Sequence, residues 1–260
     1  MKSRFPLSLI VSGVALTLAS VSGLSATAAQ GSSVSIYSAE NDFELALKYI
    51  NENNIDEGVK YLRKAANQGH AEAQTSLGIC YEYGTGVTQN AAEAVKWYRL
   101  AAEQGFAEAQ YVLGTCYLHG SGVIRDAAEA VKWYRLAAKQ GYAEAQYNLG
   151  ACHLNGIGVI RDAVEAVKWF RLAAEQGFAE AQTGLGVCYG NGTGVIRDAA
   201  EAVKWFRLAA EQGFAEAQHN LGVCYANGIG VIKDTAEAEK WFRLEAEQRK
   251  INAIKEFNNL

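Results

Sequence analysis

Hydrophobic and polar positions along this chain follow the period of an α-helix, and the whole pattern repeats every 36 residues. In the second copy, Ala109, Leu113 and Cys116 stand four and three residues apart, so a helix places them on one face. A repeat of this length is typical of a solenoid, in which one supersecondary unit stacks on copies of itself. The five copies begin at Gly69, Gly105, Gly141, Gly177 and Gly213.

Each copy is expected to hold two helices joined by a glycine turn. In the first copy, the first helix begins near Ala71 and stops at Gly84-Thr85-Gly86, where glycine permits positive φ values. The second helix starts after Asn90 as its N-cap, and Glu93 three residues later predicts a capping box. This helix ends at Gly105. Because one such hairpin cannot bury its own apolar face, the copies must stack.

The same residue types return at fixed positions of every copy. In the second copy they are Ala107–Gly114, Tyr117, Gly120–Val123, Asp126, Ala130, Trp133-Tyr134, Ala137-Ala138 and Gly141. This pattern closely resembles the Sel-one-like repeat (SLR) family, a relative of the tetratricopeptide repeats, and the match runs without gaps from Gly69 to Gln248. The resemblance implies an all-α fold, a right-handed α/α superhelical solenoid of helical hairpins. It also implies an adaptor or scaffold that works through protein–protein contacts.

Residues 1–28 are interpreted as a signal peptide. Lys2 and Arg4 give a positive start, an apolar stretch begins at Leu7, and Ala26-Thr27-Ala28 forms an A-x-A cleavage site. An uncleaved membrane anchor fits less well, because the apolar run is short and contains Ser and Thr. We therefore expect a periplasmic or secreted protein, cleaved near Ala28, that meets the membrane only during export.

The remaining segments flank the repeats. Residues 29–39 are interpreted as a linker, and residues 40–68 as a degenerate tetratricopeptide-like hairpin that turns at Asn53-Asn54 and caps the stack. Residues 69–248 hold the five repeats. Residues 249–260 predict a last helix, in which Ile251, Ile254 and Phe257 cover the final repeat. Atypical terminal units are expected in solenoids.

The five cysteines occur once per repeat, at Cys80, Cys116, Cys152, Cys188 and Cys224. Equivalent helices of neighbouring repeats should lie roughly 8–10 Å apart, whereas a disulfide needs Cα atoms within about 7 Å. We therefore predict that the cysteines are unpaired, buried, small hydrophobic residues.

The sequence predicts no catalytic, cofactor or metal site. No two histidines have the spacing of a zinc motif, and no phosphate-binding loop or S-x-x-K motif is present. Repetition also argues against an active site, which needs different residues converging at one place. Cysteine-rich relatives of the family have been linked to β-lactam hydrolysis, but alanines stand here where the second cysteines are expected. A net charge of −4, or −6 without the leader, opposes nucleic-acid binding.

Comparison of the five copies locates a candidate binding surface. Counted from the first glycine, slots seven, eight, eleven, fourteen and fifteen change most, and all lie on the first helix. At about 100° per residue they share an arc of roughly 120°. Exposed positions of the second helix, such as Glu129, Lys132, Arg135 and Gln140, are the same in every copy. Because neutral drift should alter both faces, we interpret the variable arc as a groove for a partner.

Ten residues of this arc are predicted to contact the partner. Tyr offers flat amphipathic surface, and Asn offers both donors and acceptors, which suits a protein or peptide or, alternatively, peptidoglycan or another polysaccharide. A glutamate also starts each first helix; it either stabilises the helix dipole or forms an acidic rim that favours basic partners. The predicted contacts are Tyr83, Tyr111, His119, Tyr147, Asn148, Asn155, Asn191, His219, Asn220 and Asn227, and the glutamates are Glu72, Glu108, Glu144, Glu180 and Glu216.

Overall fold

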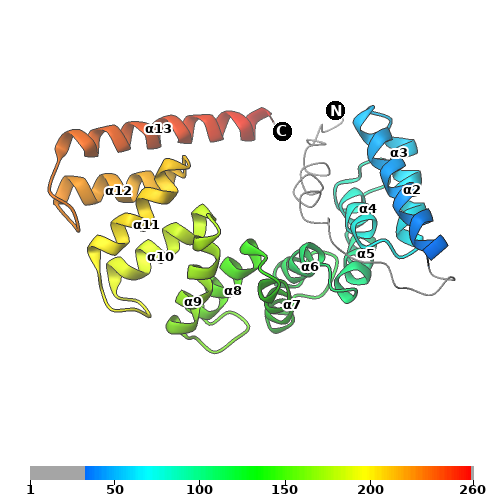
Figure 1. The fold of residues 1–260 in the computed structure, drawn as a ribbon, viewed down its shortest axis with the longest axis horizontal. Coiled ribbons are helices and arrows are strands. Elements are labelled where there is room, and N and C mark those ends of the chain that lie inside the picture. The colour runs from blue at the N-terminus through cyan, green and yellow to red at the C-terminus, as the bar shows by residue number, and fades with distance from the viewer. Residues whose placement is uncertain (1–32, 259–260) are drawn as a thin grey trace. The chain divides into compact units, whose positions relative to one another are not determined.

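The computed structural model describes residues 33–258, which form twelve α-helices and no β-strand (Figure 1). The all-α prediction is therefore confirmed for this part of the chain. The predicted signal peptide lies outside the described residues. The helices are α2 Ser33–Asn51, α3 Ile55–Asn67, α4 Ala71–Tyr83, α5 Ala91–Glu103, α6 Ala107–His119, α7 Ala127–Lys139, α8 Ala143–Asn155, α9 Ala163–Glu175, α10 Ala179–Asn191, α11 Ala199–Glu211, α12 Ala215–Asn227 and α13 Thr235–Asn258.

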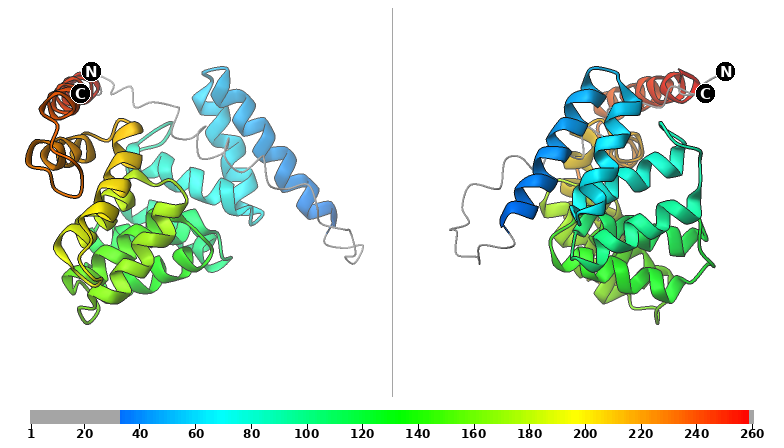
Figure 2. Two further views of the ribbon diagram at one scale, coloured as in Figure 1. Left: turned by 60° about the vertical axis from the view of Figure 1, so that its left-hand side comes forward. Right: turned by 90° about the vertical axis from the view of Figure 1, so that its right-hand side faces the viewer.

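The described helices form two compact units, with α2–α6 in the first and α7–α13 in the second. Within each unit, every helix packs against the helix before it and the helix after it along the chain. Both views of Figure 2 show α2 and α3 side by side in this way. Stacked helical hairpins of this kind are the packing of a solenoid, as predicted. Among residues 33–258, no helix combines the length and apolar character needed to cross a membrane.

The predicted bounds of the first helices are confirmed. In the first repeat α4 spans Ala71–Tyr83 and ends at Gly84, whose φ of 72° lies in the left-handed region that favours glycine. The second helix ends in a Schellman motif: Gly105 has a φ of 92° and its N–H donates to the Ala102 carbonyl at 3.0 Å. The N–H of Phe106 then donates to the Ala101 carbonyl at 3.1 Å.

The predicted capping box is only half formed. The side chain of Asn90 accepts a hydrogen bond from the Glu93 N–H at 3.1 Å, as expected of an N-cap. However, the N–H of Asn90 donates to the Tyr81 carbonyl at 2.8 Å, so it does not need the Glu93 side chain. That carboxylate instead accepts from Lys96 Nζ at 2.6 Å. The prediction of a reciprocal box was wrong because the turn folds back on the first helix.

The core of each repeat is made of alanine, leucine, cysteine and aromatic side chains. Leu149 and Leu185 are fully buried, and all five cysteines are buried and free, as predicted. Burial raises the pKa of the Cys80 thiol to about 12. Consecutive repeats meet closely at the second loop glycine, because a Cβ on Gly158 would overlap the carbonyl of Ala127 at the start of α7.

Both terminal elements differ from prediction. Helix α2 begins at Ser33, so residues 33–39 of the predicted linker are helical. The turn before α3 is confirmed, with a φ of 61° at Asn53. The predicted separate last helix does not exist, because α13 continues unbroken from the fifth repeat to Asn258. Arg249 occupies the slot that holds glycine in the other repeats, so nothing ends the helix there.

Two other exposed features were not expected. Ile251 and Ile254 do not cover the final repeat, since 45% and 60% of their surface is exposed. The side chain of Phe257 is not among those that the structure describes. In the loops of the second unit, Ile160, Ile196 and Ile232 are 90%, 90% and 91% exposed. These three isoleucines occupy one slot of successive repeats and contribute almost nothing to the core.

Candidate binding site

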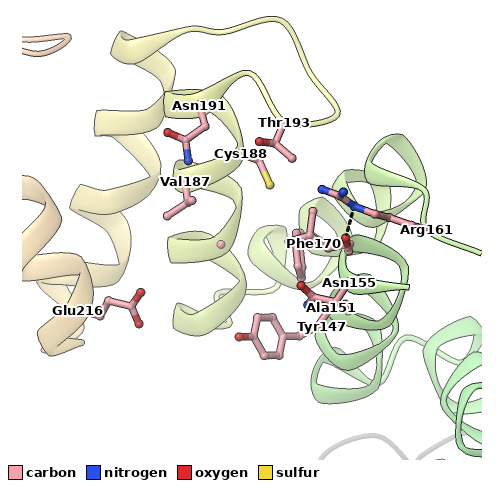
Figure 3. A pocket seen from close by; sticks show the side chains of 12 residues that line it. Tyr147, Ala151, Asn155, Arg161, Phe170, Val187, Cys188, Asn191, Thr193 and Glu216 are labelled. Carbon is pink, nitrogen blue, oxygen red and sulfur yellow. Dashed lines mark hydrogen bonds between the residues drawn. The ribbon is translucent and has the colours of Figure 1, made fainter. Parts of the chain in front are cut away.

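The second unit contains a cavity of about 680 Å³ between the first helices α8 and α10 (Figure 3). Phe170 of α9 and Glu216 of α12 also line it. Seven of the twelve lining residues occupy the variable slots of the first helices: Tyr147, Ala151, Leu154, Asn155, Gly184, Val187 and Asn191. The structure thus brings the variable positions of two consecutive repeats together around one hollow.

A small residue on α10 leaves this hollow open. Gly184 occupies the eighth slot, where the flanking repeats carry Asn148 and Asn220. A Cβ added there would lie 3.8 Å from the ring of Tyr147 and 3.9 Å from that of Phe170, which is ordinary contact distance. Because glycine has no side chain, space remains beside the half-buried Tyr147 ring and the edge of the buried Phe170 ring, where a longer residue would lie.

Tyr147 is held by aromatic contacts on two sides. Its ring centroid lies 5.5 Å from that of Phe170 and 5.7 Å from that of Phe178, at tilted angles of 35° and 56°. Burial raises the pKa of Tyr147, and the carboxylates of Glu216 and Glu180 raise it further. The hydroxyl is therefore neutral at physiological pH, and it points toward the side of the cavity where Glu216 lies (Figure 3).

Arginine and asparagine side chains form the opposite end of the cavity. Arg161, in the loop after α8, donates from Nε to the Leu154 carbonyl at 2.9 Å, which fixes the guanidinium beside the end of the helix. Asn155 donates from Nδ2 to the Ala151 carbonyl at 2.9 Å. Asn191 lines the cavity from α10. The cavity therefore has an arginine at one end, the Glu216 carboxylate at the other, and aromatic and aliphatic walls between them.

The structure separates the ten predicted contact residues into three groups. Tyr147, Asn155 and Asn191 line the cavity. Asn148, His219, Asn220 and Asn227 belong to the same unit but lie outside the cavity lining, and Tyr83, Tyr111 and His119 belong to the first unit. In the second group, His219 Nδ1 lies 3.0 Å from a Glu245 carboxylate oxygen of α13, and Asn227 donates to the Val223 carbonyl at 3.0 Å.

Part of the predicted arc is buried. Thr75 and Thr183, both in the seventh slot, are each 2% exposed, and Ser76 in the eighth slot is 6% exposed. Both threonines donate to the backbone carbonyl four residues earlier, Thr75 to Ala71 at 3.0 Å and Thr183 to Ala179 at 2.9 Å. The variable arc interpreted as a groove is therefore not exposed in every repeat, because small residues in these slots are buried.

The constancy of the second-helix surface has structural causes. Lys168 Nζ lies 2.8 Å from the Glu165 carboxylate, an i,i+3 ion pair that recurs in other repeats. Arg171 donates to the Tyr189 hydroxyl at 2.6 Å. Gln176 donates to the Gln146 amide oxygen at 2.7 Å, thirty residues earlier. These contacts explain why the surface positions of the second helices do not vary between repeats. The difference in variability between the first and second helices is therefore no evidence of a binding surface, and the cavity is.

Sequence comparison alone missed Phe170, Arg161 and Thr193 as lining residues. Phe170 belongs to the second helix, and its position is Tyr or Phe in every repeat, so it carries no signal of variation. The sequence shows the change to glycine at position 184, in the eighth slot. The open space that this glycine leaves depends on the positions of the Tyr147 and Phe170 rings, which the sequence does not give. Within residues 33–258 no group of histidine, cysteine and acidic side chains could hold a metal ion.

Comparison with known proteins places the repeats in a family. The Sel1 repeat family model matches residues 49–70, 71–106, 107–142, 143–178, 179–214 and 215–249. The first match covers most of the second half of the predicted N-terminal hairpin, so this segment is a partial sixth repeat. No protein with a curated description matches the chain.

Several solved structures share this fold. A protective antigen of uropathogenic Escherichia coli strains with an SLR fold is 34% identical, with a TM-score of 0.78; the match covers 94% of this chain and 49% of the antigen. This chain thus spans about half the length of that antigen. A Sel1 repeat protein from Oxalobacter formigenes is 36% identical, with a TM-score of 0.75, over 82% and 85% of the two chains. An immunity protein of Pseudomonas aeruginosa, PA5088, shares the fold at 19% identity and a TM-score of 0.51, over 82% of each chain. The chain belongs to the Sel1 repeat family.

Proposed function

We propose that this chain is a non-catalytic scaffold that binds a protein partner through the first helices of its second unit, at the α8–α10 cavity. Sel1 repeat proteins are scaffolds that generally act through protein–protein interaction. The observation that carries the proposal is the cavity itself, because variable residues of two consecutive repeats line one hollow there. Its aliphatic and aromatic walls offer apolar area, and its asparagines offer hydrogen bonds to a peptide backbone.

Site-specific photo-crosslinking tests this proposal in living cells. Val187 lines the cavity, whereas Val223 occupies the same slot of the next repeat and lies outside the cavity lining. A photoreactive amino acid at position 187 should capture a defined protein partner, and the same group at position 223 should not. Equal capture at both positions, or capture only at 223, would contradict the proposed site.

Asparagine variants provide a matched control for the same experiment. Asn155 and Asn227 share the fifteenth slot, and both donate to the carbonyl four residues earlier, but only Asn155 lines the cavity. Asn155→Ala should reduce capture, while Asn227→Ala should leave it unchanged. Loss of capture in both variants would indicate a general effect on the helices and would reject the cavity as the site.

A cell-wall polysaccharide is the second candidate partner. The cavity is lined by the aromatic ring of Tyr147 and by the amides of Asn155 and Asn191, a combination that also suits a sugar. Sedimentation of the protein with purified peptidoglycan distinguishes the two candidates. Co-sedimentation that is lost in Tyr147→Ala favours the glycan, whereas an unbound protein favours the protein partner.

Export is part of the proposal. It rests on the positive start, apolar stretch and A-x-A site within residues 1–28. Expression in a bacterial host followed by osmotic shock should release a protein whose N-terminal sequence begins at Ala29. An intact N-terminus in the cytoplasmic fraction would reject export and restrict the partner to the cytoplasm.

A further inference from the structure

The first helices α8, α10 and α12 of the second unit carry glutamate but no lysine or arginine. Each has one glutamate in its first turn: Glu144, Glu180 and Glu216. Several cations of the second helices are already engaged, as with Lys168 and Arg171. The face formed by these first helices therefore carries glutamates and no lysine or arginine, and its histidine His219 already lies against Glu245 of α13.

Two of these carboxylates act on the same end of the cavity. Glu216 lines the cavity, and both Glu216 and Glu180 interact electrostatically with Tyr147. Within residues 33–258, neither glutamate forms an ion pair, since every ion pair there involves other acidic residues. Like Glu180, Glu144 at the equivalent position of α8 does not line the cavity, but it is not among the charges that act on the Tyr147 hydroxyl.

We propose that the protein partner inserts a lysine or arginine side chain into this cavity between the Glu216 carboxylate and the ring of Tyr147, with the Glu180 carboxylate adding to the negative potential there. This inference rests on the proposed function and names the chemistry of its partner. A cation within about 6 Å of a tyrosine ring is attracted by the ring quadrupole. Charge-assisted hydrogen bonds to the Glu216 carboxylate add to that attraction, the Glu180 charge contributes through space, and both effects strengthen when the partner excludes water.

The end of the cavity near Arg161 suits the residues that flank the inserted side chain in the partner. Arg161 is fixed by its Nε bond to the Leu154 carbonyl, and its remaining N–H groups can donate to a backbone carbonyl or an acidic side chain. Between the two ends, Val187 and Phe170 provide apolar contact for the aliphatic stem of the inserted side chain. The cavity therefore matches an extended peptide segment with a basic side chain at the Glu216 end and a carbonyl or acidic group at the Arg161 end.

An apolar occupant fits this end of the cavity poorly. Covering Glu216 with hydrocarbon would remove water from a carboxylate and supply no counter-charge, which is unfavourable. A sugar could donate hydroxyl hydrogens to the carboxylates without neutralising them. Only a basic side chain both neutralises the carboxylates and gains a cation–π contact with the Tyr147 ring.

The test uses the full chain and a library of displayed random peptides. Peptides selected by the wild-type protein should be enriched in lysine or arginine. In the strongest peptide, replacing one basic residue by glutamine should weaken binding by about tenfold or more, measured by fluorescence anisotropy of the labelled peptide. Binding should also weaken as salt is added, because part of the attraction between the charges is screened.

Paired variants assign the effect to the cavity. The double variant Glu180→Gln/Glu216→Gln should bind the peptide about tenfold or more weakly and should no longer distinguish lysine from glutamine in it. Glu144→Gln removes an equivalent glutamate from a helix start outside the cavity, so it should change binding by less than about twofold. Thermal unfolding of the three proteins shows whether the helices are equally stable.

The outcomes separate this inference from the proposed function. Peptides without basic residues, or equal binding by the double variant and by Glu144→Gln, would overturn the inference. In that case, loss of peptide binding in Asn155→Ala would still support the cavity as the binding site, so the proposed function would stand. Selected peptides whose binding survives both Asn155→Ala and Tyr147→Ala would reject the inference and the cavity together. Failure to select any peptide would reject both as well.

Discussion

Two glycines of α10 should respond in opposite ways to the same substitution. Gly184 and Gly186 are two residues apart in one helix, and alanine at either position gains about 0.5–1 kcal/mol of helix propensity. A Cβ on Gly184 would meet the Tyr147 and Phe170 rings at 3.8 and 3.9 Å, which is ordinary contact. Gly184→Ala should therefore stabilise the protein by about 0.5–1 kcal/mol.

Gly186 faces a packed ring instead. A Cβ there would lie 2.6 Å from Phe206 Cε1 and 3.2 Å from the Ala202 carbonyl oxygen. Phe206 is itself buried, so it cannot move aside freely. Overpacking of this kind costs about 1–3 kcal/mol, which exceeds the gain in propensity. Gly186→Ala should therefore destabilise the protein.

Urea unfolding followed by helical circular dichroism measures both effects. The midpoint of unfolding should rise for Gly184→Ala and fall for Gly186→Ala, with similar m-values. A longer side chain in Gly184→Leu should occupy the part of the cavity beside Tyr147 and abolish partner capture while the protein stays folded. Equal destabilisation by both alanine variants would refute the reasoning, because it would mean that no open space exists beside Tyr147.

Further predictions concern the cysteines, the loops and the repeat contacts. The five thiols should react slowly with a disulfide reagent until denaturant exposes them; fast labelling would contradict their burial. Because the pKa of Cys80 is raised to about 12 in the folded state, the unfolded thiol ionises first, so the free energy of unfolding should fall as pH rises above about 9. This contribution should disappear in Cys80→Ala. Ile160→Ser should change stability by less than about 0.5 kcal/mol, since the side chain is 90% exposed. Gly158→Ala should lower the unfolding midpoint clearly, because its Cβ would overlap the Ala127 carbonyl.

The helices could be predicted from the sequence because glycines mark their ends. Gly84 and Gly105 adopt positive φ values that other residues disfavour, so each helix stops where the pattern indicates. The same rule explains the error at the C-terminus. Arg249 stands in the glycine slot, and α13 runs through it. The lack of glycine at position 249 therefore indicates a helix that continues beyond the fifth repeat.

The candidate site was only partly predictable because it depends on contacts between repeats. Variation between copies identified Tyr147, Asn155 and Asn191 correctly as surface positions of the first helices. It could not show that Gly184 opens a hollow, since that requires the distances to two aromatic rings. It also could not show that Thr183 of the same arc is buried.

The most direct test is a crystal structure of the full chain with a peptide selected by the wild-type protein. The peptide should lie across α8 and α10 in contact with Tyr147 and Asn191, with a basic side chain near Glu216. A peptide bound instead to the second helices, such as the surface of α9 and α11, would contradict the assignment of the cavity as the binding site.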